Sequence, residues 1–494
     1  MTTSVSTDTE ASYLGDRTDV LIGGRWVRAT GPRIPVIDPS TEETIATVTE
    51  ASEEDVRAAV AAARDAFDNG PWPTWTPQQR AAVMEKIADR IEARIPELAR
   101  IGTLEGGVPG PFSEFAQSSC VGFLRRFIAI AREYEFEREV MRPDGGESRV
   151  VSEPVGVVAA IVPWNGALPL TGLKLGPALI AGCTAVLKTP QETPLTTFVF
   201  AEVIAELTES GDLPPGVVSV LTAGAEVSQA LVADPNVDKI SFTGSTVVGK
   251  QIMAVAAERI ARVTLELGGK SAAIILDDAP IDDVLQTLVL GGCGYTGQMC
   301  FGLTRVLVSR EREAELLEKF AAALEALPVG SAHDASTMIG PLTVDRQLPR
   351  VQGYVDLAVS EGARIVTGGG RPATPERGYF FQPTLLADVR PDMRIAQEEV
   401  FGPVISVITY EDVDDAVRIA NNSDYGLAGS VYTSDIEAGY QIARRIRTGT
   451  CSVNGAVLEI CVPFGGFKQS GLGREGGVEG FAEYLEKKSI HMPA

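Results

Sequence analysis

Cys300 is the residue best placed to act as a nucleophile. It lies in the segment 294–305, GYTGQMCFGLTR, with a glycine at 297 and another at 302. Small neighbours leave room for a substrate to approach the sulfur and the backbone amide, and the thiolate is the reactive form of cysteine. A buried structural cysteine is the alternative. It is the interpretation we give to the other five cysteines, at positions 120, 183, 293, 451 and 461.

Glu266 is the first candidate for a general base. It ends an apolar stretch in TLELGGKS and is followed by a leucine and two glycines. The chain turns there and can hold the carboxyl group in a poorly hydrated wall, which raises its pKa toward the range of a useful base. A surface glutamate before a turn is the alternative. The chain has only two histidines, His333 in a polar stretch and His491 near the end, so the base is expected to be a carboxylate or a lysine.

The segment 241–250, SFTGSTVVGK, has the pattern of a strand, a turn and a helix. Gly244 and Ser245 form the turn, and the backbone N–H groups that open the helix can bind a pyrophosphate. The glycines are spaced Gly-x-x-x-x-Gly, so the dinucleotide fingerprint Gly-x-Gly-x-x-Gly is not met. An ordinary strand-turn-helix is therefore the alternative to a phosphate site.

Two further polar residues follow strand-like runs. Asn165, in VPWNGALPL, can cap a helix, or its amide can donate a hydrogen bond to a developing oxyanion. Lys188 ends the apolar run in VLKTPQETP, where a lone lysine is ordinarily solvated.

The elements that must position these residues alternate between strand and helix patterns. Residues 155–267 contain four strand-like runs separated by segments of helical spacing, which predicts βαβ units and a doubly wound parallel sheet. A second series begins at 271–276 and continues through RVLVS, VISVIT and GSVYTS. Helices predicted for 53–104 pack on one of these sheets. The segment 135–152 and the C-terminal tail are too short to form a core alone, so they are expected to pair with another element or subunit.

Length and charge limit the classes of function. A chain of 494 residues with 45% hydrophobic residues is expected to form two or three domains. With 66 acidic and 43 basic residues the net charge is -23, which disfavours nucleic acid and membrane surfaces as partners. The sequence has no apolar run long enough to span a membrane and no targeting segment, so we expect a cytoplasmic protein. The cysteine spacing predicts reduced thiols and no metal site.

Seven motifs in order resemble the aldehyde dehydrogenase superfamily, in its NAD(P)-dependent, non-acylating type. The resemblance covers the chain from about residue 22 to the end. Its motifs are PWN at 163–165, LKTP at 187–190, FTGST at 242–246, ELGGK at 266–270, GQMC at 297–300, EEVFGP at 398–403 and PFGGFKQSG at 463–471.

The resemblance implies an α/β fold with three parts. These are a doubly wound, Rossmann-like cofactor domain (19–131 and 155–267), an α/β catalytic domain (268–469) and a small β oligomerisation arm (132–154 and 470–494). Residues 1–18 would be a disordered lead-in. Homo-oligomers, dimers or tetramers, would form through the arm.

The resemblance also assigns the catalytic roles. Cys300 would attack the aldehyde carbon, and the alkoxide would be held by the Asn165 amide and the Cys300 backbone N–H. Hydride would pass to the nicotinamide and leave a thioester. Glu266 would then activate the water that hydrolyses the thioester to a carboxylic acid.

The cofactor residues follow in the same way. Lys188 matches the family's cofactor lysine, Ser245 its pyrophosphate contact and Glu399 the carboxylate that holds the nicotinamide ribose, while Trp164, Gly244 and Phe401 line the pocket. Gln191 stands where NAD-preferring relatives often have a glutamate. A glutamine can bond to the ribose hydroxyls but does not repel a 2′-phosphate, so NAD is expected and NADP is possible.

Positions that carry aromatic rings in well-known relatives are small or aliphatic here, and Phe464 is the ring that remains. The wall predicted for the substrate comprises Gly166, Leu170, Leu173, Leu458 and Phe464, with Gly294 nearby. Such an entrance fits a bulky, apolar aldehyde. Tyr295 replaces an asparagine that is common in this loop.

Two other functions remain open. A CoA-acylating relative would pass the acyl group to CoA, but such enzymes commonly lack the glutamate found here at 266. A catalytically silent binding or structural homologue would not need the nucleophile, oxyanion donor, base and cofactor lysine that are all present in this chain.

Overall fold

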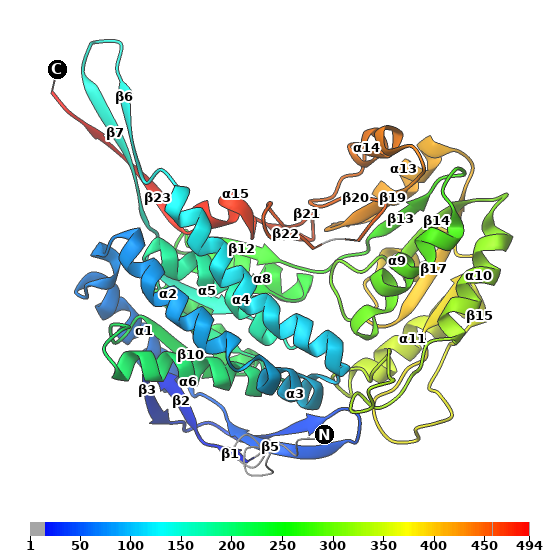
Figure 1. Cartoon of the computed structure of the whole chain (residues 1–494), viewed down its shortest axis with the longest axis horizontal. Helices are drawn as coiled ribbons and strands as arrows, with labels where there is room; N and C mark the ends of the chain where they lie inside the picture. Colours follow the sequence, from blue (N-terminus) through cyan, green and yellow to red (C-terminus); the bar gives the residue numbers. More distant parts are fainter. Residues whose placement is uncertain (1–14, 457, 494) are drawn as a thin grey trace, which may run out of the picture.

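The computed structural model describes residues 15–456 and 458–493 and comprises two α/β bodies and a projecting β arm (Figure 1). The lead-in predicted for residues 1–18 lies, up to residue 14, outside the described residues. Within the described part of the chain, no helix has the length and apolar character needed to cross a membrane.

The first body is built on an eight-stranded sheet in the order β22-β12-β11-β8-β9-β10-β2-β3. Its central strands are parallel: β8 (Val157–Ile161), β9 (Thr184–Thr189), β10 (Val218–Thr222), β11 (Lys239–Thr243) and β12 (Arg262–Glu266). Antiparallel strands complete both edges: β2 (Asp19–Ile22), β3 (Arg25–Arg28) and β22 (Gly471–Leu472). The chain leaves β8 in one direction and returns to β11 on its other side, which creates a topological switch point where such sheets bind ligands.

Strand β8 shows why this sheet is covered on both faces. Val158 and Ala160 pack into one core, and Val157, Ala159 and Ile161 pack into the core on the other face. Successive side chains of a strand point to opposite faces, so a continuous apolar run requires helices on both sides.

Helices cover both faces of this sheet. One core includes α2 (Pro77–Glu92), α3 (Ile95–Gly106), α4 (Gly110–Glu133), α5 (Ala167–Ala181) and α6 (Leu195–Glu209). The other includes α1 (Glu53–Asp68), α7 (Ala225–Ala233) and α8 (Thr246–Ala257). Helix α1 starts at a capping box in which Ser52 and Asp55 satisfy each other's backbone N–H groups. The helices predicted for 53–104 are therefore present.

The second body is a seven-stranded sheet in the order β15-β16-β17-β14-β13-β19-β20. Its strands are β13 (Ala272–Ile275), β14 (Arg305–Ser309), β15 (Arg364–Thr367), β16 (Thr384–Ala387), β17 (Val404–Tyr410), β19 (Gly429–Tyr432) and β20 (Ser452–Val453). Its helices are α9 (Ile281–Cys293), α10 (Glu313–Glu325), α11 (Gln347–Ser360), α12 (Arg394–Gln397), α13 (Val413–Asn421) and α14 (Ile436–Ala443). Two cores, one on each face, fill this body as in the first.

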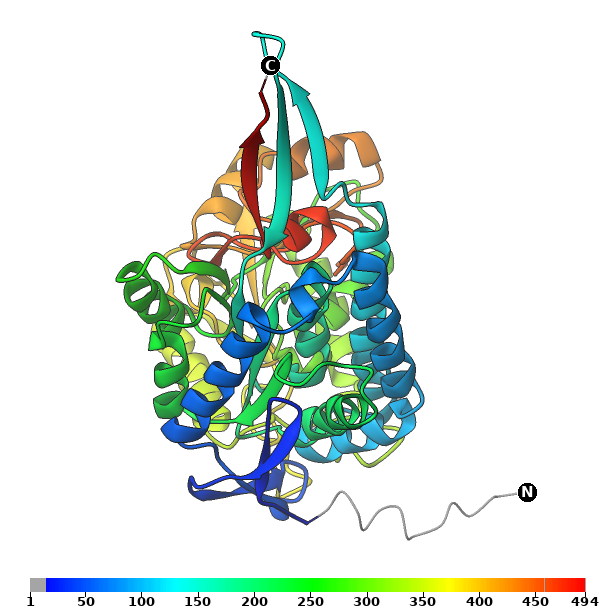
Figure 2. The same cartoon turned by 90° about the vertical axis from the view of Figure 1, so that its left-hand side faces the viewer.

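The arm is a three-stranded antiparallel sheet that projects away from both bodies (Figures 1 and 2). Its strands are β6 (Glu137–Met141), β7 (Glu147–Pro154) and β23 (Leu485–His491). Strand β22 and α15 (Gly477–Ala482) precede β23, and β22 pairs with β12 of the first sheet. The C-terminal residues thus divide at about Leu485 between the first body and the arm.

A short N-terminal sheet joins the two bodies. It consists of β1 (Asp16–Arg17), β5 (Glu43–Thr49) and β4 (Arg33–Asp38). Asp38 is the last residue of β4, and its Oδ2 lies 2.7 Å from Nε2 of His333 in the second body. The Ala332 N–H donates to Ser40 Oγ at 3.1 Å, and the Tyr379 N–H donates to the Pro39 carbonyl at 2.9 Å. These contacts hold the second body against the N-terminal sheet.

Candidate active site

One cavity of about 1110 Å³ brings most of the predicted site residues together. Cys300, Glu266 and Asn165 all line it. The predicted cofactor positions that line it are Trp164, Gly244, Ser245, Glu399 and Phe401. The predicted substrate positions Gly166, Leu170, Leu173, Leu458 and Phe464 line it as well. Lys188 and Gln191 are absent from its lining, so they would meet only a ligand that extends beyond this space.

Cys300 is held by an unusual turn. It follows a 3-10 turn at Gly294–Gly297, in which Tyr295 and Thr296 have left-handed backbone angles, with φ of 49° and 54°. The ELGGK motif packs against the backbone of Cys300. A Cβ at Gly269 would lie only 2.2 Å from the Cys300 carbonyl oxygen. Only glycine allows that approach, so the two motifs are packed backbone to backbone.

Asn165 follows β8 at the switch point and contacts the nucleophile loop. Its Nδ2 donates to the Gln298 backbone carbonyl at 2.9 Å. One N–H of this amide is used by that bond, and the other is left for a ligand in the cavity.

The surroundings of the Cys300 thiol raise its pKa. Burial raises its pKa, and the nearby carboxylates of Glu399 and Glu266 raise it further. A positive charge or hydrogen-bond donors near the sulfur would lower this pKa and favour the thiolate.

Glu266 ends β12 and is 2% exposed. Neither of its carboxyl oxygens has a hydrogen-bond partner among the described residues. Burial raises the pKa of Glu266 well above its usual value, and the charge of Glu475 adds to the shift. A carboxyl group in that environment takes up a proton readily, as a general base must.

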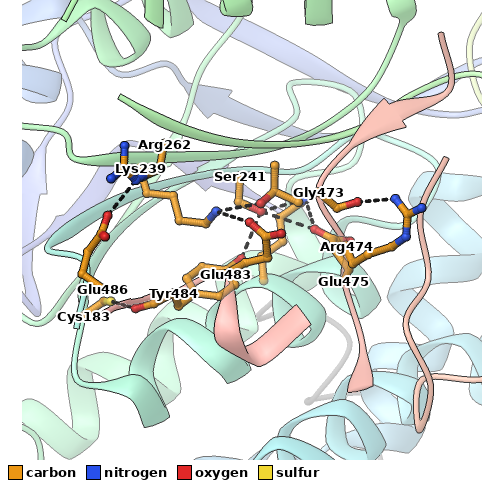
Figure 3. Close-up of polar contacts among 12 residues, drawn as sticks. Cys183, Lys239, Ser241, Arg262, Gly473, Arg474, Glu475, Glu483, Tyr484 and Glu486 are labelled. Atoms are coloured by element: carbon orange, nitrogen blue, oxygen red, sulfur yellow. Dashed lines mark hydrogen bonds and ion pairs between the residues drawn. The ribbon is translucent and has the colours of Figure 1, made fainter. Parts of the chain in front are cut away.

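Figure 3 shows a buried polar cluster that includes Ser241, Glu475 and Tyr484, and the charge of Glu475 acts on Glu266. Glu475 Oε1 accepts from Lys174 Nζ at 2.6 Å and from Ser241 Oγ at 3.3 Å. The Tyr484 hydroxyl donates to Ser241 Oγ at 3.1 Å. Sequence reasoning missed this cluster, although a lysine in the apolar segment ALPLTGLKLGPALIA is a signal that it must be paired.

The residues predicted to hold pyrophosphate and nicotinamide form a cradle. Ser245 caps α8 and accepts from the Val248 N–H at 3.4 Å, so this helix begins at the cavity. Glu399 Oε1 accepts from the Gly269 N–H at 3.0 Å. A Cβ at Gly268 would lie 2.6 Å from Glu399 Oε2. The start of α8 at Ser245 can bind an anion such as a pyrophosphate, and the Glu399 carboxylate can accept hydrogen bonds from ribose hydroxyls. Both groups occur in a dinucleotide.

Lys188 and Gln191 lie at the end of β9. Burial lowers the pKa of Lys188 to about 8, an effect opposed by the charges of Glu192 and Glu50. Gln191 Nε2 donates to Glu50 Oε1. The role of Glu50 was not predicted, because Glu50 lies 141 positions from Gln191 in the sequence. Only the tertiary fold brings the two side chains together.

The other half of the cavity is apolar. Phe464 packs edge-on against Phe301, with ring centroids 6.5 Å apart. Helix α4 contributes a stripe that was not predicted, with Phe112, Phe115, Ala116, Ser119 and Phe123. The helical spacing of 112, 115, 116, 119 and 123 is the signal that could have identified this face. Phe115 is 77% exposed, so its ring stands at the mouth.

Comparisons with known proteins agree with the fold and identify the family of this chain. Residues 26–490 match the family model described as "Aldehyde dehydrogenase family". Geranial dehydrogenase of Castellaniella defragrans is 41% identical over 479 residues, which are 97% of this chain and 99% of that protein. The 3-succinoylsemialdehyde-pyridine dehydrogenase of a Pseudomonas species is 40% identical, over 96% of this chain and 98% of that protein.

A crystal structure of a Mycobacterium tuberculosis aldehyde dehydrogenase complexed with NAD+ superposes with a TM-score of 0.94 at 44% identity, covering 97% of this chain and 99% of that one. The chain belongs to the aldehyde dehydrogenase family. The predicted family, fold class and enzyme class are thereby confirmed.

Proposed function

We propose that this enzyme oxidises bulky, apolar aldehydes to carboxylic acids with NAD+, through a thioester on Cys300 that water hydrolyses. The observation that carries the proposal is the shared cavity, in which a cysteine, an amide donor and a buried carboxyl meet between a polar cradle and an apolar wall. The name of the geranial dehydrogenase and the NAD+ complex of the Mycobacterium tuberculosis relative support the substrate class and the cofactor.

The cofactor would be held by groups already described. The start of α8 at Ser245 would bind the pyrophosphate, Glu399 the nicotinamide ribose, and Lys188 with Gln191 the adenosine ribose. Bound NAD+ supplies the hydride acceptor at its nicotinamide ring. Glu50, hydrogen-bonded to Gln191, places a carboxylate beside the predicted adenosine ribose, and this supports NAD+ over NADP+.

The chain's own groups carry out the rest of the chemistry. Cys300 loses its proton and its sulfur bonds to the aldehyde carbon, while the oxygen gains negative charge. The free N–H of Asn165 and the Cys300 backbone N–H stabilise that charge, an effect for which one donor typically accounts for about 100- to 1000-fold in rate. After oxidation, Glu266 removes a proton from water, which attacks the thioester carbon and releases the acid and the thiol.

The apolar wall supports the substrate class. Leucines at 170, 173 and 458 and the phenylalanines of α4 offer surface to a hydrocarbon chain. Burial of apolar surface is worth roughly 25 cal/mol per Å², so a longer aldehyde gains binding energy that a small polar one does not.

The experiment that tests the proposal is a steady-state screen of aliphatic, aromatic and terpenoid aldehydes with NAD+ and NADP+ side by side. We expect kcat/KM to rise with the apolar area of the substrate and to be higher with NAD+ than with NADP+. Cys300→Ala should abolish oxidation, while Cys293→Ala and Cys461→Ala should not. Near-normal turnover by Cys300→Ala would refute the mechanism.

Two alternatives are included in the same assay. Added CoA should not accelerate turnover, since the base Glu266 favours water as acyl acceptor. A silent homologue would form no NADH with any aldehyde of the panel.

We further propose that the protein is a cytoplasmic homo-oligomer, a dimer or homotetramer assembled through the arm. Analytical ultracentrifugation measures the size of this oligomer.

A further inference from the structure

Tyr295 takes part in a hydrogen-bonded tether that crosses between the two bodies. Thr343 Oγ1 donates to the Gly106 carbonyl of α3 at 2.8 Å. The hydroxyl of Thr343 has only one proton, so at the 3.3 Å contact between the two side chains Tyr295 is the donor. The tether therefore runs from the nucleophile loop through Thr343 to the first body.

Gln298 connects this tether to the oxyanion site. Its Oε1 accepts from the Thr343 N–H at 2.9 Å, and its Nε2 donates to the Tyr295 carbonyl at 3.2 Å. Its backbone carbonyl is the group that accepts from Asn165 Nδ2. Gln298 is fully buried, and Thr343 is 4% exposed, so these bonds are shielded from water.

The loop needs such a tether because its backbone is strained. Tyr295 and Thr296 both have left-handed angles, which non-glycine residues, and β-branched ones above all, adopt only at an energetic cost. Thr296 Oγ1 donates to the Gly340 carbonyl at 3.0 Å, and Gly297 packs against the backbone at 402–403. Contacts with the segments at 340–343 and 402–403 thus hold the conformation.

We propose that Tyr295 is a positioning residue for the oxyanion site. Its hydroxyl holds the turn that carries Gln298, and the Gln298 carbonyl aims the Asn165 amide so that its second N–H faces the bound aldehyde oxygen. This inference rests on the proposed function, because it assumes that Asn165 stabilises the oxyanion. Family resemblance does not supply this role, since Tyr295 departs from the asparagine common at this place.

The test is a double-mutant cycle between Tyr295→Phe and Asn165→Ala. The rate constant of NADH formation is measured in a single turnover with enzyme in excess. Tyr295→Phe should lower it about tenfold when Asn165 is present, which is less than the loss of a whole oxyanion donor. In the Asn165→Ala background the same change should have an effect of less than about twofold, because the group it positions is absent.

Two controls separate positioning from general damage. Alkylation of Cys300 by iodoacetamide forms no oxyanion, so its rate should be unchanged in Tyr295→Phe. Thr343→Val, which breaks the tether from the other side, should reproduce the tenfold loss, whereas Thr343→Ser, which keeps the hydroxyl, should not.

Equal losses in both Asn165 backgrounds, or no loss with Asn165 present, would overturn the role of Tyr295 alone. An unchanged single-turnover rate in Asn165→Ala would instead overturn the oxyanion role of Asn165, and with it both the mechanism and this inference.

Discussion

Lys174 Nζ and Glu475 Oε1 form a buried ion pair at 2.6 Å between residues that are 301 positions apart. Their side chains are 0% and 2% exposed. The pair joins α5 to the segment that leads into α15, and it lies close enough to Glu266 to affect its charge. Burial is the main cause that raises the pKa of Glu266; Glu475 raises this pKa further and Lys174 lowers it, so the pair adjusts the proton affinity of the proposed base.

Glu475→Gln should lower the pKa of Glu266, because the carboxylate that raises it is removed while Lys174 remains. The acid limb of the thioester hydrolysis rate should therefore move to lower pH. The change also leaves the buried lysine without its counter-charge, at a cost of about 3–5 kcal/mol in the free energy of unfolding. Rapid-mixing kinetics over pH and thermal unfolding measure the two effects. Glu479→Gln, at an exposed position of α15, is the control. A shift of the limb to higher pH would contradict this account.

Glu266→Gln should separate the two half-reactions. The thioester and one equivalent of NADH per site should still form in a burst, and turnover should then stall. Loss of a positioned base typically costs about 100- to 10,000-fold in rate. Stopped-flow detection of NADH measures both phases. A slowed or missing burst would indicate that Glu266 mainly activates the thiol, and an intact steady-state rate would leave it only a structural role.

Gln191→Glu should weaken NADP+ far more than NAD+, since it adds a charge that repels the 2′-phosphate. Glu50→Gln should have the opposite effect and strengthen NADP+ relative to NAD+, because it removes the carboxylate next to Gln191. Dissociation constants from fluorescence titration give both ratios without turnover. If each variant changed the two cofactors equally, the discrimination would lie elsewhere.

Gly166→Phe should restore a ring at the apolar wall and reduce the space for bulky substrates. A Cβ at this position would contact only Leu170, at 3.5 Å, so the backbone accepts a side chain there. We expect kcat/KM to fall at least about tenfold for a terpenoid aldehyde, a steric loss of about 1.4 kcal/mol or more, and to change little for propanal. Equal losses for both aldehydes would argue against a substrate path along this wall.

The contact between His333 and Asp38 should make stability depend on pH. The hydrogen bond between the His333 ring and Asp38 raises the pKa of His333 above the usual 6.5. A raised histidine pKa gives stability that is complete below the unfolded pKa and is lost as pH rises through the folded pKa. The melting temperatures of the wild type and His333→Ala should therefore differ most near pH 5.5 and least near pH 9. A difference that grew with pH would contradict the assignment.

The strand pattern of the sequence was sufficient to predict the two parallel sheets, because apolar runs such as that of β8 need cover on both faces. Family motifs placed Cys300, Glu266 and Asn165 near one another, and all three line the cavity. The division into domains and the individual roles of these residues stay predictions.

What the sequence could not reveal depends on contacts between distant segments. Glu475 and Glu50 have no distinctive neighbours in the chain, and each gains its meaning only from the partner that the fold brings to it. Tyr295 was recognised as a departure from the family, but its tether to Thr343 requires the loop at 340–343 to lie beside it.

The β arm has a consequence for how a single chain of this protein behaves. The outer edges of β6 and β23 have no partner strand within the described chain, and Met141 and Ile490 are 70% and 42% exposed. Open edges with apolar side chains recruit further strands. In a single chain separated from the proposed homo-oligomer, the arm is therefore the place where aggregation is expected to begin.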